Sequence, residues 1–142
     1  MTKTLKTLLY FFSLYHLVLG LMGILLTSLT QLVERTIAIA FNFSITMDDQ
    51  TIWMIKVVAV YMLIMGIISF FAAKDPIKYK PIVYAISGLI GIRVIQRVLF
   101  AFEGDNFIIN ADPTRNIIAL IFLAIYGLAI LISALKIKEE AK

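Results

Sequence analysis

Residues 52–73 read IWMIKVVAVYMLIMGIISFFAA, and almost all of them are apolar. Lys56 is the only charged residue among these 22 positions. The hydrocarbon core of a bilayer is about 30 Å thick and an α-helix rises about 1.5 Å per residue, so about 20 apolar residues are enough to cross it. The stretch therefore predicts a transmembrane helix.

Three further segments have a similar length and apolar character. They are Leu5–Leu29, Ile82–Phe102 and Ile117–Leu135. Hydrophobic residues make up 61% of the chain and charged residues 15%, whereas about 25% of the residues of a soluble domain are charged. We therefore predict an all-α integral membrane protein whose four transmembrane helices form an antiparallel bundle, with residues 1–142 as a single domain.

The lysines indicate how the four helices are oriented. Eight of them flank chain regions that an antiparallel bundle brings to one side, namely Lys3, Lys6, Lys74, Lys78, Lys80, Lys136, Lys138 and Lys142. The loops of the other side carry Arg35 and Arg115 among several acidic residues. Because cytoplasmic loops are enriched in Lys and Arg, both termini are predicted to be cytoplasmic. The net charge of +4 then reflects topology and contact with anionic membrane lipids, and nucleic acid is not an expected partner.

The loop between the first two helices has a different periodicity. From residue 36 to residue 46, bulky apolar side chains alternate with small or polar ones. A period of two is typical of a half-buried strand, and such a strand needs a partner, which Phe107–Ile109 of the second outer loop offers. We predict a small β-strand cap on the extracytoplasmic end of the bundle. An interfacial helix or an extended loop on the headgroups is the alternative.

A polar cluster is predicted near the middle of the bilayer. In the third segment, two arginines and a glutamine are spaced by three and four residues and so share one helix face. Counting residues from the helix ends places polar residues of the other segments at similar depths. The candidate partner- or ligand-binding residues are His16, Lys56, Tyr61, Arg93, Gln96, Arg97 and Tyr126.

Three interpretations of this cluster remain open. An arginine at the bilayer centre costs at least about 2.5–3.5 kcal/mol on insertion scales, and no Asp or Glu lies within the four segments to compensate it. The arginines could bind helix carbonyls, tyrosines and the outer glutamates and so fix the packing. They could instead face an acidic group of another subunit or a lipid phosphate. They could also line a pocket for a small anionic or quinone-like ligand.

The residue types exclude several kinds of chemistry. The chain has no cysteine and a single histidine, His16, so disulfides, thiolate chemistry and haem ligation by two histidines of this chain are impossible. His16 is expected to be a hydrogen-bonded packing residue. The alternative is that it ligates a pigment or haem shared with another subunit. Without a catalytic triad, a phosphate-binding loop or paired intramembrane carboxylates, we predict no catalytic residues, no metal site and no enzymatic activity.

Three pieces of the sequence carry a family resemblance: HLVLGLMGIL at residues 16–25, AAKDPIKYKP at residues 72–81, and Arg93 in the third segment. With them the chain resembles the small four-helix bacterial membrane proteins of the DoxX-like type. The resemblance implies a bacterial inner-membrane location and an accessory role, in some members within quinone-dependent redox complexes. We therefore predict a non-catalytic accessory or scaffold subunit of a larger membrane complex. The alternative is a protein that binds or transports a small molecule, a quinone or a lipid.

Overall fold

The computed structural model describes residues 2–25, 32, 35, 48–103 and 113–137. Within these ranges it contains four long helices and no strand. They are α1 (Thr2–Ile24), α3 (Asp49–Lys74), α4 (Lys80–Glu103) and α5 (Pro113–Leu135). All four contain segments long and apolar enough to cross a membrane, so the all-α prediction of four such helices is confirmed. The predicted strand cap, residues 36–46 and 107–109, lies outside the described residues.

Two of the helix ends differ from the predicted ones by four or more residues. α5 begins at Pro113, whereas the apolar segment begins at Ile117. Proline suits the first turn of a helix, and polar residues are tolerated at a helix end. Hydropathy alone therefore underestimates the length of this helix. The extension places Asn116 on α5. The C-terminal end of α1 comes earlier than predicted, at Ile24 and not at Leu29.

α3 begins and ends at recognisable caps. At its N-terminus the Asp48 carboxylate accepts a hydrogen bond from the Thr51 amide at 2.7 Å. Hydrogen bonds from Thr51 to the charged carboxylate lower the pKa of Asp48 below its ordinary value. At its C-terminus α3 stops before Asp75, which precedes Pro76, because proline disfavours the helical conformation of the residue before it.

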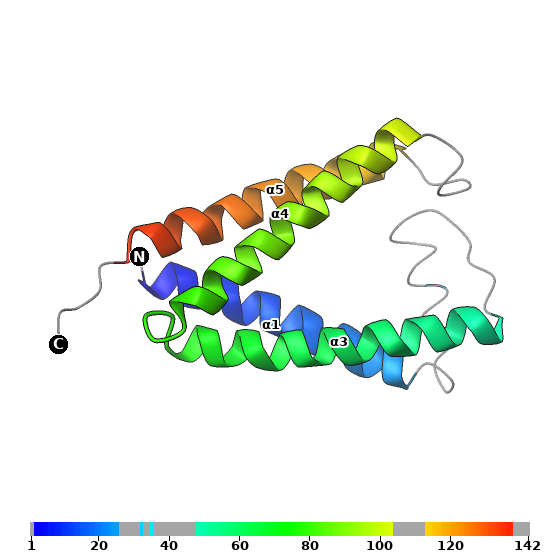
Figure 1. Cartoon of the computed structure of the whole chain (residues 1–142), viewed down its shortest axis with the longest axis horizontal. Helices are drawn as coiled ribbons and strands as arrows, with labels where there is room; N and C mark the ends of the chain where they lie inside the picture. The colour runs from blue at the N-terminus through cyan, green and yellow to red at the C-terminus, as the bar shows by residue number, and fades with distance from the viewer. Residues whose placement is uncertain (1, 26–31, 33–34, 36–47, 104–112, 138–142) are drawn as a thin grey trace.

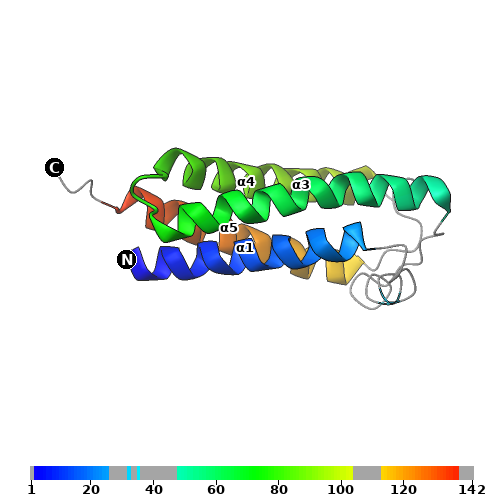
Figure 2. The same ribbon diagram turned by 90° about the horizontal axis from the view of Figure 1, so that it is seen from below.

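The four helices form two antiparallel pairs. α1 packs along α3 and α4 packs along α5, with smaller contacts between the pairs. Figure 1 shows that the pairs meet at the end where α1 begins, here called the converging end, and separate toward the other end. In Figure 2 all four helices run roughly along one common direction. The buried apolar core comprises Leu5, Leu9, Phe12, Ala72, Ala73, Val83, Ile86, Ile90, Ile130, Ala134 and Ile137.

Small residues allow the helices of each pair to approach closely. At Gly20 of α1, an added Cβ atom would lie 2.7 Å from a backbone nitrogen of α3. The Ser13 hydroxyl donates to the carbonyl oxygen of Gly66 at 2.8 Å, and the Ser87 hydroxyl donates to that of Gly127 at 3.3 Å. Close approach at small residues and hydrogen bonds across the interface are the forces that associate helices in lipid. Each pair is therefore a tightly packed unit.

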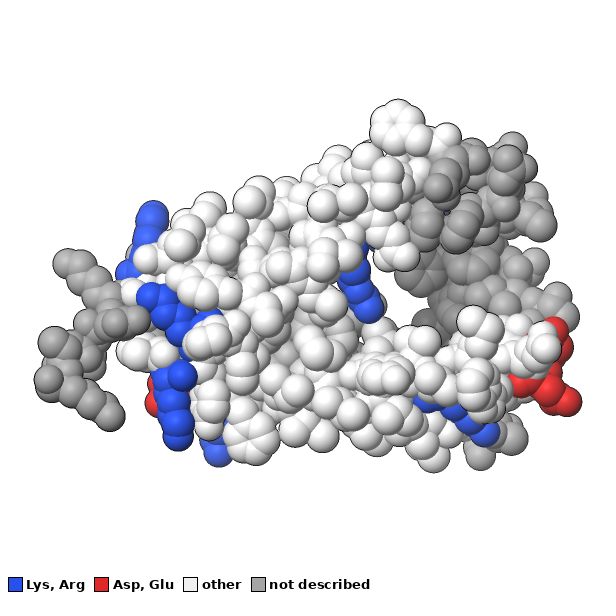
Figure 3. Space-filling view, in the orientation of Figure 1, with Lys and Arg blue, Asp and Glu red and all other residues white. Residues whose placement is uncertain are grey.

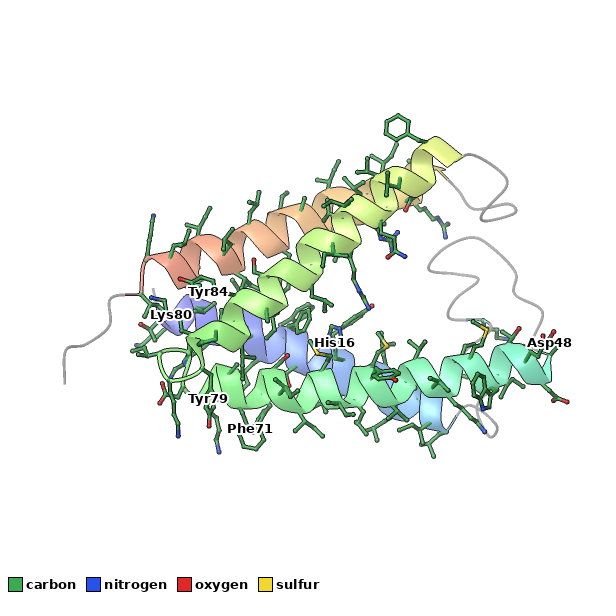
Figure 4. All side chains as sticks on the ribbon, viewed as in Figure 1. His16, Asp48, Phe71, Tyr79, Lys80 and Tyr84 are labelled. Carbon is green, nitrogen blue, oxygen red and sulfur yellow. The ribbon has the colours of Figure 1, made fainter. Side chains whose placement is uncertain are left out.

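Basic side chains gather at the converging end, as Figure 3 shows. Lysines there lie over aromatic rings, with the nitrogen-to-centroid distances Lys74 to Phe70 5.6 Å, Lys78 to Tyr79 5.3 Å and Lys80 to Tyr84 6.0 Å. Figure 4 labels the tyrosines of the last two pairs. At the opposite end two acidic residues mark the start of α3, namely its N-cap Asp48 and its first residue Asp49. Lysine and tyrosine side chains arranged in this way are typical of a membrane–water interface.

Candidate ligand-binding site

A pocket lies between the two helix pairs, close to the point where they separate. Its volume is about 520 Å³, within the range of about 300–1,000 Å³ that is common for ligand sites. Figure 3 shows a hollow between the pairs with basic side chains at its edge. Residues of α1, α4 and α5 line the pocket, and α3 contributes none of its lining residues.

On each of the three helices the lining residues share one face. Those of α1 are Phe11, Phe12, Tyr15 and His16. Those of α4 are Ile90, Arg93, Gln96 and Arg97. Those of α5 are Asn116, Ala119, Phe122, Leu123 and Tyr126. Because residues three and four apart lie one above the other on a helix, each set forms a continuous strip along the pocket.

Aromatic rings from α1 and α5 form one wall of the pocket. Phe122 and Tyr126 are stacked, with centroids 6.0 Å apart and an interplanar angle of 12°. Phe11 meets Tyr126 edge-on at 6.1 Å and 64°. Stacked and edge-on arrangements are the favourable geometries for aromatic pairs. The wall is therefore apolar and held in place by ring contacts.

His16 lies between α1 and α4 in Figure 4, and its side chain is 3% exposed. Its Nδ1 atom is 2.8 Å from the carbonyl oxygen of Phe12. Because a carbonyl oxygen only accepts hydrogen bonds, Nδ1 carries the hydrogen and donates it. The second ring nitrogen, Nε2, is buried and has no hydrogen-bond partner among the described residues. A buried polar atom left without a partner costs about 1–3 kcal/mol.

The two arginines of α4 have different surroundings. Arg97 donates to the side-chain oxygen of Asn116 on α5 at 2.7 Å. Arg93 lies one turn nearer the converging end, and its guanidinium makes no hydrogen bond or ion pair in the described part of the chain. It is within electrostatic reach of the His16 ring. The pocket therefore presents a cation for which the described residues provide no counter-charge.

Tyr126 connects the two helix pairs. Its hydroxyl donates to the carbonyl oxygen of Leu8 on α1 at 2.5 Å, while its ring lines the pocket. The hydrogen bond thus fixes the position of the aromatic wall relative to α1.

We expect Tyr126→Phe to lower the free energy of unfolding by about 1 kcal/mol, because a hydrogen bond contributes a net 0.5–1.5 kcal/mol or so. Tyr61→Phe is the matched control, since the Tyr61 side chain is 66% exposed; its effect should stay within about 0.5 kcal/mol. Thermal unfolding in lipid nanodiscs, followed by circular dichroism, measures both. Equal losses in the two variants would show that the Tyr126 hydroxyl does not hold the pairs together.

The structure brings most of the predicted polar cluster together. The predicted residues in the pocket are His16, Arg93, Gln96, Arg97 and Tyr126. Tyr61 and Lys56 do not line it, because both lie on α3. Counting residues gives the depth of Tyr61 but not its direction. Ala59 of α3 packs against Gly23 of α1. At about 100° per residue, Tyr61 lies about 200° around the helix from Ala59 and so points away from α1.

Apart from Tyr126, the aromatic residues of the wall were not predicted from the sequence, and neither was Asn116. Ala119, Phe122 and Tyr126 do recur at helical spacing on one strip of α5. However, aromatic residues are equally compatible with the lipid-facing side of an apolar helix. The spacing therefore does not single out Phe122, whereas the depth of Tyr126 did place it in the predicted cluster. Asn116 was missed because it precedes the apolar segment that predicted the helix.

The described ranges contain no group of three or more His, Asp or Glu residues that could hold a metal ion. Comparisons with protein-family models, characterised proteins and solved structures find no match for this chain. The resemblance to the DoxX-like family stays a prediction, and function has to be inferred from the pocket.

Proposed function

We propose that this chain is an integral membrane protein that binds an anionic amphipathic ligand in the pocket between its two helix pairs. The observation that carries the proposal is Arg93, a cation with no counter-charge among the described residues, which lines a pocket of ligand size. A charge kept away from water without a partner costs several kcal/mol. An anionic ligand supplies the missing charge.

The exterior of the helices supports insertion in a bilayer. Large apolar side chains such as Phe71, Ile92 and Ile125 are exposed on the described helices, and lipid would cover them. Lysines at the converging end and acidic residues at the start of α3 support cytoplasmic termini. In this orientation the helix pairs separate toward the outer leaflet. A bacterial inner-membrane location rests on the family resemblance alone.

The pocket lining indicates the chemical class of the ligand. The planar guanidinium of Arg93 suits a carboxylate or a phosphate, and the aromatic wall suits an apolar body. A quinone carbonyl accepts hydrogen bonds but carries no charge, so it would leave the charge of Arg93 unpaired. A lipid or fatty acid with an acidic head group therefore fits the pocket better than a quinone does.

An accessory-subunit function would draw on the same arginine. A carboxylate on a helix of another subunit could pair with Arg93, and the hollow between the helix pairs in Figure 3 leaves space for a partner. Residues of three helices of this chain already line the pocket, and its volume of about 520 Å³ suits a small ligand better than an additional helix. The two functions predict different masses for the extracted protein.

Native mass spectrometry of the protein, extracted together with its own lipids into polymer nanodiscs, separates these functions. We expect a monomer or homo-oligomer that carries an acidic lipid or fatty acid, and loss of that ligand in Arg93→Met. Arg115→Met is the matched control, because Arg115 is an exposed arginine of α5 that does not line the pocket. Co-purification of defined larger subunits that is lost in Arg93→Met would overturn the proposal and establish an accessory subunit.

A further inference from the structure

Among the pocket side chains that are at least partly buried, Arg93 and His16 each have a polar group without a partner among the described residues, and the two groups have opposite requirements. The Arg93 guanidinium on α4 can only donate hydrogen bonds. The Nε2 atom of His16 on α1 accepts one in the neutral ring, because Nδ1 already carries the hydrogen and donates it to Phe12. Both residues line the same pocket and lie within electrostatic reach of each other. A ligand between them meets both requirements only if it accepts from one and donates to the other.

On the basis of the proposed binding function, we propose that the ligand is an anionic amphiphile whose head group also carries a hydroxyl. Its anionic oxygen binds Arg93, its hydroxyl donates to His16 Nε2, and its apolar chain lies against the wall formed by Phe122 and Tyr126. A simple anion would satisfy Arg93 and leave the histidine nitrogen buried without a partner. The hydroxyl is therefore the feature by which this pocket selects among acidic lipids.

Two kinds of molecule offer this chemistry, namely a free hydroxy fatty acid and a phospholipid with hydroxyls beside its phosphate. Each has a matched probe without the hydroxyl. The first pair is 2-hydroxypalmitate and palmitate, and the second is phosphatidylglycerol and phosphatidylmethanol. The uncharged 1,2-hexadecanediol retains hydroxyls and lacks the acid. Titration of each probe into phosphatidylcholine nanodiscs that hold the full chain, read by native mass spectrometry, gives the relative affinities.

We expect the wild-type protein to bind the hydroxylated probe of one pair about ten-fold more tightly than the probe without the hydroxyl. The probe without the hydroxyl leaves the buried His16 Nε2 atom without a hydrogen-bond donor. The pair that shows this preference identifies the source of the ligand. The diol should bind weakly. In Arg93→Met, binding of the acids should fall to the level of the diol.

His16→Asn isolates the role of the histidine nitrogen. The asparagine amide nitrogen takes the place of Nδ1 and can still donate to Phe12, whereas the position of Nε2 is left empty. We expect the preference for the hydroxyl to disappear while the affinity for palmitate or phosphatidylmethanol is retained. His16→Gln, whose amide oxygen reaches toward the Nε2 position, should keep part of the preference for the hydroxyl. The comparison of the paired probes on the wild-type protein does not depend on whether either variant folds.

The outcomes separate this inference from the proposed function. If no acidic probe binds, or if binding does not depend on Arg93, the proposed function fails and the inference fails with it. If acids bind through Arg93 with equal affinity whether or not they carry a hydroxyl, the inference is overturned and the proposed function stands. A preference for the hydroxyl that persists in His16→Asn also overturns the assignment to His16.

Discussion

Replacement of Arg93 by methionine is expected to make the ligand-free protein more stable, although it no longer binds its ligand. Methionine has a similar unbranched stem and no charge, and it would extend the apolar surface around Ile90 and Leu123. Placing an arginine at the centre of a membrane helix costs at least about 2.5–3.5 kcal/mol on insertion scales. Because Arg93 has no partner in the described ranges, the substitution should recover up to about 3 kcal/mol in the free energy of unfolding.

The test is thermal or denaturant unfolding of delipidated wild-type and variant protein in phosphatidylcholine nanodiscs. Arg97→Met is the matched comparison, since Arg97 donates to Asn116 at 2.7 Å. Its loss should destabilise the protein by about 1–3 kcal/mol, because Asn116 loses its charged donor. If Arg93→Met were as destabilising as Arg97→Met, Arg93 would stabilise the ligand-free protein, and its charge would not be left unpaired until a ligand binds.

A second large effect is expected at the contact between α1 and α3. A Cβ atom at Gly20 would lie 2.7 Å from the backbone nitrogen of Leu63 and 2.9 Å from its Cα atom. Backbone atoms cannot move aside without separating the helices. We therefore expect Gly20→Val to lower the free energy of unfolding by about 3 kcal/mol, at the upper end of the usual cost of overpacking.

Gly88→Val is the matched control for this substitution. A Cβ atom at Gly88 on α4 meets nothing within 4 Å, and valine is a better helix former than glycine. Its effect on the unfolding free energy should be zero or slightly stabilising, measured under the same conditions. If both substitutions destabilised the protein to a similar extent, the cost would come from placing valine in a helix. It would then not come from the close approach of α1 to α3.

The helices were predictable because their existence depends on local sequence. Each apolar segment is long enough to cross a bilayer, and neither its length nor its hydropathy depends on what lies beside it. The ends were less predictable, as Pro113 and Ile24 show, because caps and prolines are not read by hydropathy. The pocket was predicted in part, because counting depth along the helices placed His16 and Tyr126 in the cluster and helical spacing placed three residues of α4 there. Arg93, Gln96 and Arg97 share a face by their spacing alone.

The remaining pocket residues depend on how separate helices are rotated. Tyr61 lies at a depth that suggested a place in the pocket, yet it faces away because Ala59 and Gly66 turn α3 toward α1. Asn116 lies 19 positions along the chain from Arg97, on another helix. No spacing rule predicts that contact, because it depends on the relative rotation of α4 and α5.

The sequence by itself therefore determined four membrane-length helices, the side on which their basic residues gather, and one helix face with two arginines. Only the tertiary structure decided that the helices form two tight pairs that separate at one end, and that Arg97 has a partner while the described residues offer none to Arg93. The physical reason is that hydropathy and helical spacing act along one chain segment. Rotation, pairing and charge compensation are set by side chains from different helices, such as Gly20 against Leu63 and Tyr126 against Leu8.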